Sequence, residues 1–273
     1  MNAISKLLAV ALLVLPAQAA FAQNTIDSCG TEITSSGTYL VTQDLTNTDG
    51  HCISVEATDV TVDCQGYRLT DDGTTAIPDE SGIWVGYNSI GVVIRNCDIY
   101  SFVNGIYYTG NGGVIEDNKL EDNYRGIRLS VGDGDEVRWN TGNDNVYGMV
   151  MDLSNNSNIY ENTFNRNDYG LYCHRGAGNY ITANQLNHNN ARGLWFYSTC
   201  NNNFIWHNTA NLNNNGFLIQ SGSSGNDFYK NVLNRNDARG INDGAGNATQ
   251  NIYEDNVCKN NGTEPSNVAG ACK

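Results

Sequence analysis

The chain has few basic residues and almost no proline. Its 273 residues include 3 Pro, and 15 Lys and Arg stand against 29 Asp and Glu, for a formal net charge of −14. Nucleic acids and anionic membranes attract basic surfaces, so this charge argues against both as partners. After residue 22 no apolar run approaches the roughly 20 residues that a membrane-spanning helix needs. We therefore expect no membrane span and no nucleic-acid partner.

Residues that favour helices are also scarce, whereas turn-forming residues are abundant. The chain holds 29 Gly and 42 Asn. Both residue types favour turns and left-handed backbone over helix interiors. Long helices are therefore not expected.

The first 22 residues differ from the rest. Lys6 supplies a positive start, residues 7–15 form a short apolar run, and Ala20, Phe21 and Ala22 form a small-x-small cleavage site. This pattern is typical of a secretory signal peptide. We expect residues 1–22 to be removed and the mature chain, residues 23–273, to be secreted or periplasmic.

Cysteine spacing argues against a metal site. The chain has no C-x-x-C pair and no tight Cys/His cluster, so no metal ligands are assigned. An even number of cysteines in an exported chain indicates disulfides. Proximity along the chain favours four pairs: Cys29–Cys52, Cys64–Cys97, Cys173–Cys200 and Cys258–Cys272.

A repeat of 21–24 residues begins at residue 82. A glycine followed by an apolar residue recurs at Gly82, Gly105, Gly126, Gly148, Gly170, Gly193, Gly216 and Gly240. Asparagines keep the same interval in two further series. These are Asn96, Asn118, Asn140, Asn162, Asn184, Asn208, Asn231 and Asn256, and then Asn123, Asn145, Asn167, Asn189, Asn213, Asn236 and Asn261. Such a period predicts a solenoid, in which like asparagines hydrogen-bond from coil to coil.

Each repeat carries two short segments of alternating apolar and polar residues, such as 170–173 and 179–182. Alternation with a period of two predicts strands rather than helices. The G-I-x-[LVF]…N-x-I-x-x-N…N-x-x-G pattern over roughly residues 50–262 resembles the repeat of pectate-lyase-like and NosD-type carbohydrate-binding and sugar-hydrolase proteins. That resemblance implies an all-β fold: a single right-handed parallel β-helix, here of about ten coils. We expect an N-terminal cap over 23–50, coils over 51–257, a C-terminal cap over 258–273, and a monomer.

Function is expected on the outer face of the strands that begin at the repeated glycines. If the residue after each glycine points inward, the residues at −1, +2 and +4 point outward. Arginines and aromatics concentrate there, and such a face suits the rings and carboxylates of an acidic polysaccharide. The expected substrate-binding residues are Arg125, Tyr107, Tyr147, Arg175, Arg192, Trp195 and Tyr197.

The centre of this face is the segment 168–175. His174 is expected beside Asp152 of the preceding coil and Tyr197 of the next. A His with Tyr and Arg suits β-elimination: Arg neutralises a uronate carboxylate, His or an ionised Tyr removes the C-5 proton, and a Tyr protonates the leaving oxygen. The expected catalytic residues are His174, Tyr172, Arg128, Tyr169 and Asp152.

The segment 169–174 also resembles the Y-G-x-D-P-H segment of alginate C-5 epimerases and related lyases. It departs from that pattern at Tyr172, where the family has Asp, and at Cys173, where it has Pro.

We therefore expect a polysaccharide lyase that cleaves an acidic, uronate-containing glycan. A mannuronan-type C-5 epimerase and a non-catalytic NosD-type or glycan-binding β-helix protein remain alternatives. No cofactor is assigned. A Ca²⁺ requirement stays open because the turn 132–136 offers several carboxylates.

Overall fold

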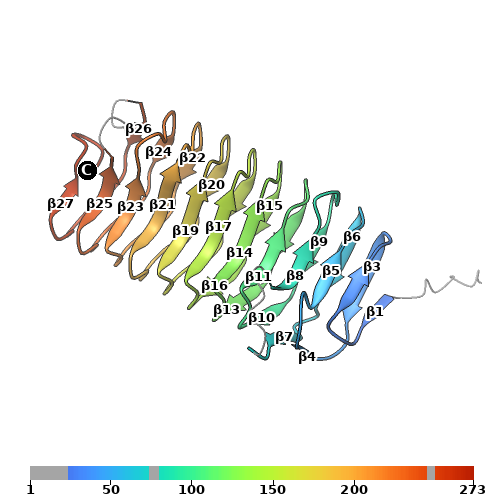
Figure 1. The fold of residues 1–273 in the computed structure, drawn as a ribbon. Helices are drawn as coiled ribbons and strands as arrows, with labels where there is room; N and C mark the ends of the chain where they lie inside the picture. Colours follow the sequence, from blue (N-terminus) through green and yellow to red (C-terminus); the bar gives the residue numbers. More distant parts are fainter. Residues whose placement is uncertain (1–23, 74–79, 245–249) are drawn as a thin grey trace, which may run out of the picture.

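The computed structural model describes residues 24–73, 80–244 and 250–273, which form one parallel β-solenoid (Figure 1). Every strand pairing is parallel, and these three ranges contain no helix. Accordingly, no helix in them is long and apolar enough to cross a membrane. The prediction of an all-β solenoid of about ten coils is confirmed. The predicted signal peptide lies outside the described residues.

Three sheets run along the solenoid. Sheet I has 11 strands. They are β1 (Asn24–Ile26), β3 (Gly37–Val41), β6 (Val60–Asp63), β9 (Val93–Arg95), β12 (Val114–Glu116), β15 (Glu136–Arg138), β18 (Asn158–Tyr160), β20 (Tyr180–Thr182), β22 (Phe204–Trp206), β24 (Asp227–Tyr229) and β26 (Ile252–Glu254).

Sheet II is shorter, with 5 strands. They are β4 (Leu45–Asn47), β7 (Arg68–Asp71), β10 (Asp98–Tyr100), β13 (Lys119–Glu121) and β16 (Thr141–Asn143). Beyond β16 its line continues as single parallel bridges through Thr163, Gln185, Thr209, Val232 and Val257.

Sheet III has 11 strands and contains the segments that begin at the repeated glycines. They are β2 (Thr31–Ile33), β5 (Ile53–Val55), β8 (Ser81–Val85), β11 (Asn104–Tyr108), β14 (Arg125–Ser130), β17 (Tyr147–Asp152), β19 (Tyr169–His174), β21 (Arg192–Ser198), β23 (Asn215–Ile219), β25 (Arg239–Asp243) and β27 (Glu264–Ser266). In the central coils the chain passes from sheet III to sheet I, then sheet II, then back to sheet III.

Both ends of the described chain take part in the sheets. Strands β1 to β4, from the segment predicted as an N-terminal cap, pair with later strands of their sheets. Strand β27, from the predicted C-terminal cap, pairs with β25. The exact limits of caps and coils, and the monomeric state, stay predictions.

The residue after each repeated glycine points into the core, as predicted. Each is at most 1% exposed: Ile83, Ile106, Ile127, Met149, Leu171, Leu194, Phe217 and Ile241. The glycines are required by the close approach of neighbouring coils. A Cβ on Gly126 would lie 2.6 Å from the Gly148 carbonyl oxygen, and one on Gly170 would lie 2.6 Å from that of Gly193. Any side chain there would force the coils apart.

Buried asparagines connect the coils as the sequence predicts. Asn162 donates from Nδ2 to Asn184 Oδ1 (3.0 Å) and accepts from Asn140 Nδ2 (3.0 Å). The same bond repeats along the first series from Asn118 to Asn256. In the second series side-chain or backbone amides donate to the next Asn Oδ1 from Asn123 to Asn261. Each amide thereby fixes the register of the next coil.

One member of the first series was assigned wrongly. Cys97, not Asn96, occupies the ladder position, since its backbone N–H donates to Asn118 Oδ1 (3.0 Å). Asn96 is at the preceding corner with φ 55°, and its Nδ2 donates to Asp63 Oδ1 (3.0 Å). A further ladder that the repeat analysis missed runs through Asn179, Asn203, Asn226 and Asn251.

The four predicted disulfides are all confirmed: Cys29–Cys52, Cys64–Cys97, Cys173–Cys200 and Cys258–Cys272. Structural disulfides form and persist in oxidising compartments, which fits an exported protein.

Asp135 lies two coils before the missed ladder, and its N–H donates to Ser157 Oγ (3.2 Å), whose own N–H donates to Asn179 Oδ1 (2.9 Å). It is 1% exposed, and Oδ1 accepts from the Gly113 N–H (3.0 Å) while Oδ2 has no hydrogen-bond partner in the described part of the chain. Burial, and then the charge of Asp133, raise the pKa of Asp135 from 3.8 to about 7. A group with a raised pKa in the folded state stabilises it fully only at low pH.

We predict that Asp135→Asn removes a pH dependence of stability. In the wild type, stability should fall by a few kcal/mol as pH rises from about 4 to about 7, because the unfolded carboxyl ionises near pH 4 whereas the folded carboxyl keeps its proton up to about pH 7. The variant should lack this slope and be more stable at pH 8, measured by denaturant unfolding. Exposed Asp122→Asn, which removes a carboxylate that does not act on Asp135, is the control, and an unchanged slope in Asp135→Asn would contradict the assignment.

Candidate functional site

The outer face of sheet III carries the predicted rows in register. Tyr107 pairs with Arg128, Arg128 with Val150, Val150 with Tyr172, and Tyr172 with Trp195. In the adjacent row Arg125, Tyr147, Tyr169 and Arg192 follow one another on successive coils. All of these side chains are half-buried except Val150, which is 6% exposed beneath its neighbours. The predicted direction of both rows is therefore confirmed.

His174 and Asp152 meet at the centre of this face. Their strands β19 and β17 are paired, and His174 Nδ1 lies 3.0 Å from Asp152 Oδ1. Arg175 Nη2 lies 3.6 Å from the same oxygen. A carboxylate on Nδ1 fixes the ring orientation and leaves Nε2 as the atom for proton transfer.

Tyr197 departs from its predicted place in the row. The register shifts after Cys173, so His174 pairs with Ser198 and Tyr197 is an extra residue on β21. Such a bulge turns a side chain away from its regular direction. The Tyr197 ring is 43% exposed but still lies 5.6 Å from the His174 ring, between centroids.

Aromatic rings form a continuous cluster around this centre. Tyr147 stacks on Tyr169 (4.8 Å), and Tyr169 stacks on Trp195 (5.1 Å). Tyr172 meets Trp195 edge-on at 4.9 Å and lies 6.4 Å from His174. The cluster joins both rows into one surface across β17, β19 and β21.

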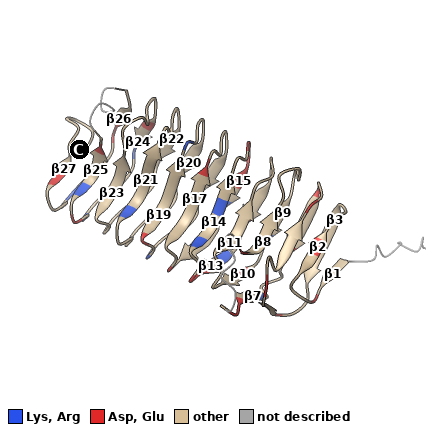
Figure 2. Cartoon of the chain, viewed as in Figure 1, with Lys and Arg blue, Asp and Glu red and all other residues tan. Residues whose placement is uncertain are grey.

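Guanidinium groups lie over aromatic rings of this surface. The Arg192 guanidinium carbon is 4.1 Å from the centroid of the Trp195 ring and 5.5 Å from that of Tyr169. Arg128 lies 4.4 Å from the ring of Tyr107, two coils from β19. Figure 2 shows basic residues spread along sheet III among strands that are otherwise largely uncharged. Stacked guanidiniums keep their N–H edges available for carboxylates.

Two side-chain donors on β21 have no acceptor among the described residues. Arg192 Nε and Trp195 Nε1 are buried without a hydrogen-bond partner in the part of the chain that the structure describes. Unpaired buried donors are uncommon and call for an explanation. Oxygen atoms of an anionic ligand would supply the missing acceptors.

Tyr172 is held in its protonated form. Burial, followed by the neighbouring Tyr147, Tyr197 and Asp152, raises the pKa of Tyr172 to about 12. Burial also raises the pKa of Tyr147. At neutral pH the Tyr172 phenol is thus protonated.

Tyr124, which was not among the predicted residues, extends this surface. Its ring lies edge-on to Tyr147 (5.7 Å), and the Arg125 guanidinium lies 4.7 Å from its centroid. Tyr124 also lines a cavity of about 540 Å³ with Asp144, Arg166 and Asp168. Tyr124 directly precedes Arg125 of the outward row. A coil-by-coil comparison of the residues at this corner would therefore have identified it from the sequence.

The turn considered for Ca²⁺ directs its carboxylates to separate partners. Asp133 accepts from Asn156 Nδ2 (2.7 Å), Asp135 accepts from the Gly113 N–H, and Glu136 pairs with Arg138 (2.6 Å). A Ca²⁺ requirement stays a prediction for assay.

Comparison with known proteins identifies related sequences and folds. The profile of the family described as periplasmic copper-binding protein (NosD) matches residues 22–213 and 68–263. No curated protein sequence matches the chain. The disulfides together with this periplasmic family confirm the predicted secreted or periplasmic location.

Several solved structures share the fold. The periplasmic alginate epimerase AlgG superposes with a TM-score of 0.63 at 16% identity, over 86% of this chain and 73% of its own. The A-module of Azotobacter vinelandii mannuronan C-5 epimerase AlgE4 gives 0.60 at 13%, over 90% and 88%. The Dettilon tailspike protein gives 0.70 at 13%, over 92% and 58%. At these identities the likeness concerns the fold alone.

We predict that the Tyr172 phenol ionises near pH 12, whereas an ordinary tyrosine ionises near pH 10. The variant Tyr172→Phe should therefore lack one tyrosinate titration step near pH 12. The physical reason is the cost of ionising a phenol that is buried among other rings. Ultraviolet absorbance against pH, with circular dichroism at each pH to confirm folding, measures the step. Tyr180→Phe, on sheet I, should leave that step in place. A step lost near pH 10 in Tyr172→Phe would contradict the assignment.

Proposed function

The chain belongs to the NosD family, and on this fold we propose that the outer face of sheet III binds a uronate-containing polysaccharide and cleaves it by β-elimination. One observation carries the proposal: a His174–Asp152 pair lies within a cluster of aromatic rings and stacked arginines on an otherwise acidic protein. Aromatic rings suit the flat faces of sugars, and guanidinium forks suit their carboxylates.

We expect substrate binding to use two arginines of the sheet III face, one within the aromatic cluster and one two coils from β19. Arg192, on Trp195 and Tyr169, offers one carboxylate site, and Arg128, on Tyr107, offers another. The unpaired donors of Arg192 and Trp195 lie between the rings and gain acceptors when a carboxylate binds. Since both are desolvated, a charged acceptor there contributes more than it would in water.

Side chains of this face can supply both the base and the acid that β-elimination needs. His174 Nε2 removes the C-5 proton, and Asp152 stabilises the resulting imidazolium through Nδ1. The electron pair of the C–H bond forms the C4–C5 double bond as the C4–O bond breaks. Tyr172, which its raised pKa keeps protonated at neutral pH, donates its phenolic proton to the leaving oxygen. An arginine on the uronate carboxylate stabilises the charge that develops at C-5.

A C-5 epimerase is the second candidate because it shares the first step. The neighbours AlgG and AlgE4 are epimerases by name, and both align over most of this chain. In that reaction a proton returns to the opposite face of C-5 and no double bond remains. A glycan-binding protein without turnover would use the same surface for binding alone.

Copper binding, which the family's description implies, does not fit this chain's residues. Copper sites need thiolate, thioether or clustered imidazole ligands. All cysteines are in disulfides, and Met149 and Met151 are 0% exposed in the core. Within residues 24–73, 80–244 and 250–273 no group of three His, Cys, Asp or Glu is placed to hold a metal. We therefore derive no step through copper.

We predict that the mature protein acts on one of four uronate polymers: alginate, pectate, hyaluronan or chondroitin. Elimination should produce an unsaturated uronate with new ultraviolet absorbance. Epimerisation should leave absorbance unchanged and alter the NMR spectrum of the polymer. Parallel reactions with a chelator test the Ca²⁺ requirement. Binding with neither change would support the non-catalytic alternative, and no binding to any of the four would contradict the proposal.

On the active polymer, His174→Ala should lower kcat by about 10²–10⁴-fold with little change in binding, because it moves a proton only in the transition state. Exposed His188→Ala is the matched control. Arg128→Ala should weaken both binding and turnover, whereas Arg235→Ala, at an exposed corner, should not. Full activity in His174→Ala would place the catalytic base elsewhere.

A further inference from the structure

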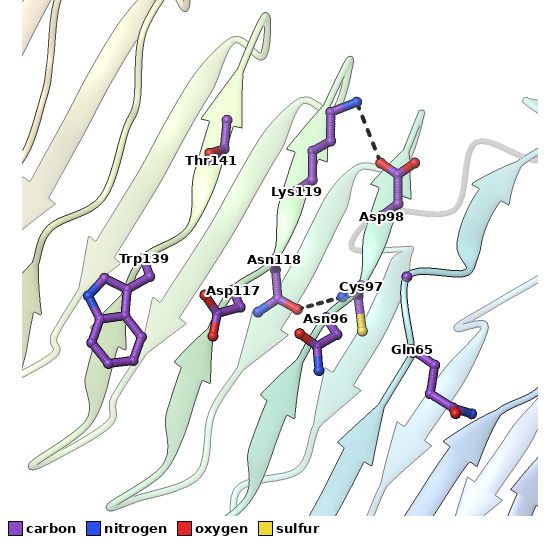
Figure 3. Close-up of a pocket in the computed structure, with 10 residues that line it drawn as sticks. Gln65, Asn96, Cys97, Asp98, Asp117, Asn118, Lys119, Trp139 and Thr141 are labelled. Atoms are coloured by element: carbon purple, nitrogen blue, oxygen red, sulfur yellow. Dashed lines mark hydrogen bonds and ion pairs between the residues drawn. The ribbon is translucent and has the colours of Figure 1, made fainter.

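A second concave surface lies away from sheet III. It runs along the corner where sheet I turns into sheet II and encloses about 780 Å³. Two rows from successive coils border it (Figure 3). One row is at the corner (Gln65, Asn96, Asp117 and Trp139), and the other is at the start of the sheet II strands (Asp98, Lys119 and Thr141). We call this surface the corner groove.

Trp139 stands at a corner that the coils from Gln65 to Asp255 all pass through with left-handed backbone. Its φ is 56°, like those of Asn96 (55°), Asp117 (54°) and Glu161 (55°) at the equivalent positions. The backbone there belongs to the fold, and what distinguishes Trp139 is the indole that it adds to the lining of the corner groove.

The indole of Trp139 is exposed yet held in place. It is 47% exposed, and its Nε1 donates to Glu161 Oε2 of the next coil (2.6 Å). The Arg138 guanidinium lies 4.6 Å from its centroid, and Tyr160 meets it edge-on. A ring fixed before binding loses little conformational entropy when a ligand packs on it.

The polar groups of the corner groove argue against an anionic ligand. Its lysine, Lys119, is already paired with Glu121 (2.8 Å) and Asp98 (3.8 Å). Asp98 also accepts from Arg68 (2.8 Å). The carboxylate of Asp117 is exposed and has no hydrogen-bond partner in the part of the chain that the structure describes. A second negative charge placed here would be repelled.

The remaining lining suits a ligand with many hydroxyl groups. Gln65, Asn96 and Thr141 add amide and hydroxyl groups, and the indole is the large apolar surface. The volume of about 780 Å³ falls within the range of small-ligand sites, about 300–1,000 Å³. An apolar ligand would find little to pack on beyond one ring.

We propose that the corner groove binds an uncharged oligosaccharide, with one sugar ring packed on Trp139 and hydroxyls hydrogen-bonded to Asp117 and its neighbours. Aromatic rings bind the apolar face of a sugar, and carboxylates accept from its hydroxyls. The site differs from the sheet III face in location and in charge, so it stands independently of the proposed uronate reaction.

The test is a calorimetric titration of the mature protein with neutral oligosaccharides of glucose, galactose, mannose, xylose and N-acetylglucosamine. At least one should bind and alter tryptophan fluorescence. Trp139→Asn introduces a residue that tolerates the positive φ, so it should weaken binding at least tenfold without lowering the unfolding midpoint. Asp117→Asn should weaken binding several-fold. Trp206→Ala, an indole on sheet I that is 38% exposed, should bind like the wild type.

Three results would overturn the proposal. The first is that no neutral oligosaccharide in the panel binds. The second is that Trp139→Asn binds as tightly as the wild type. The third is that oligouronates compete for the site in a Trp139-dependent way, which would assign the groove to acidic glycans. Because these titrations use neutral sugars and corner variants, a failure of the uronate reaction leaves their outcome unchanged.

Discussion

The stacking register of the coils is the constraint on which the rest of the structure depends. Along the ladders an asparagine Oδ1 accepts from the coil before it, and a side-chain or backbone amide donates to the coil after it, as at Asn162 between Asn140 and Asn184. An unpaired buried amide costs more free energy than an average hydrogen bond contributes, so a slip by one residue is strongly disfavoured. The same register that aligns the ladders inside aligns the rows of arginine and aromatic side chains outside. The candidate site is thus a consequence of buried amides that no ligand touches.

Departures from the repeat are informative because the repeat is otherwise strict. The extra residue at Tyr197 redirects a ring beside His174, and Trp139 places an indole at a corner where the adjacent coils have Asp117 and Glu161. Asp135 lies in line with the buried ladder that begins at Asn179, and its Oδ2 has no hydrogen-bond partner among the described residues. Local rules of this kind are broken mainly where function or strain compensates. Two of the three departures lie at the surfaces proposed here to bind glycans.

Much of the fold could be predicted from the sequence because its signals are periodic. The glycine interval determined which residues point inward, and the sheet III rows follow from strand alternation alone. The disulfide pairs also followed, since cysteines close in sequence lie on adjacent coils. Asn96 was misassigned because spacing cannot tell a ladder residue from its neighbour at the corner, and only the Cys97 amide bond decides.

The chemistry of the site was less predictable for reasons of packing. The protonated state of Tyr172 depends on burial among rings from three coils, which a one-dimensional pattern does not contain. The corner groove was missed because its lining comes from left-handed corner residues, whose side chains follow no strand alternation.

The central claim is that sheet III carries an acidic-glycan site between β14 and β21. A crystal structure of the His174→Ala variant with a bound oligouronate tests it most directly. The account predicts sugar rings against Tyr172 and Trp195, with a carboxylate within hydrogen-bond distance of Arg192 or Arg128. An oligouronate bound on sheet I or in the corner groove, with sheet III unchanged, would contradict it.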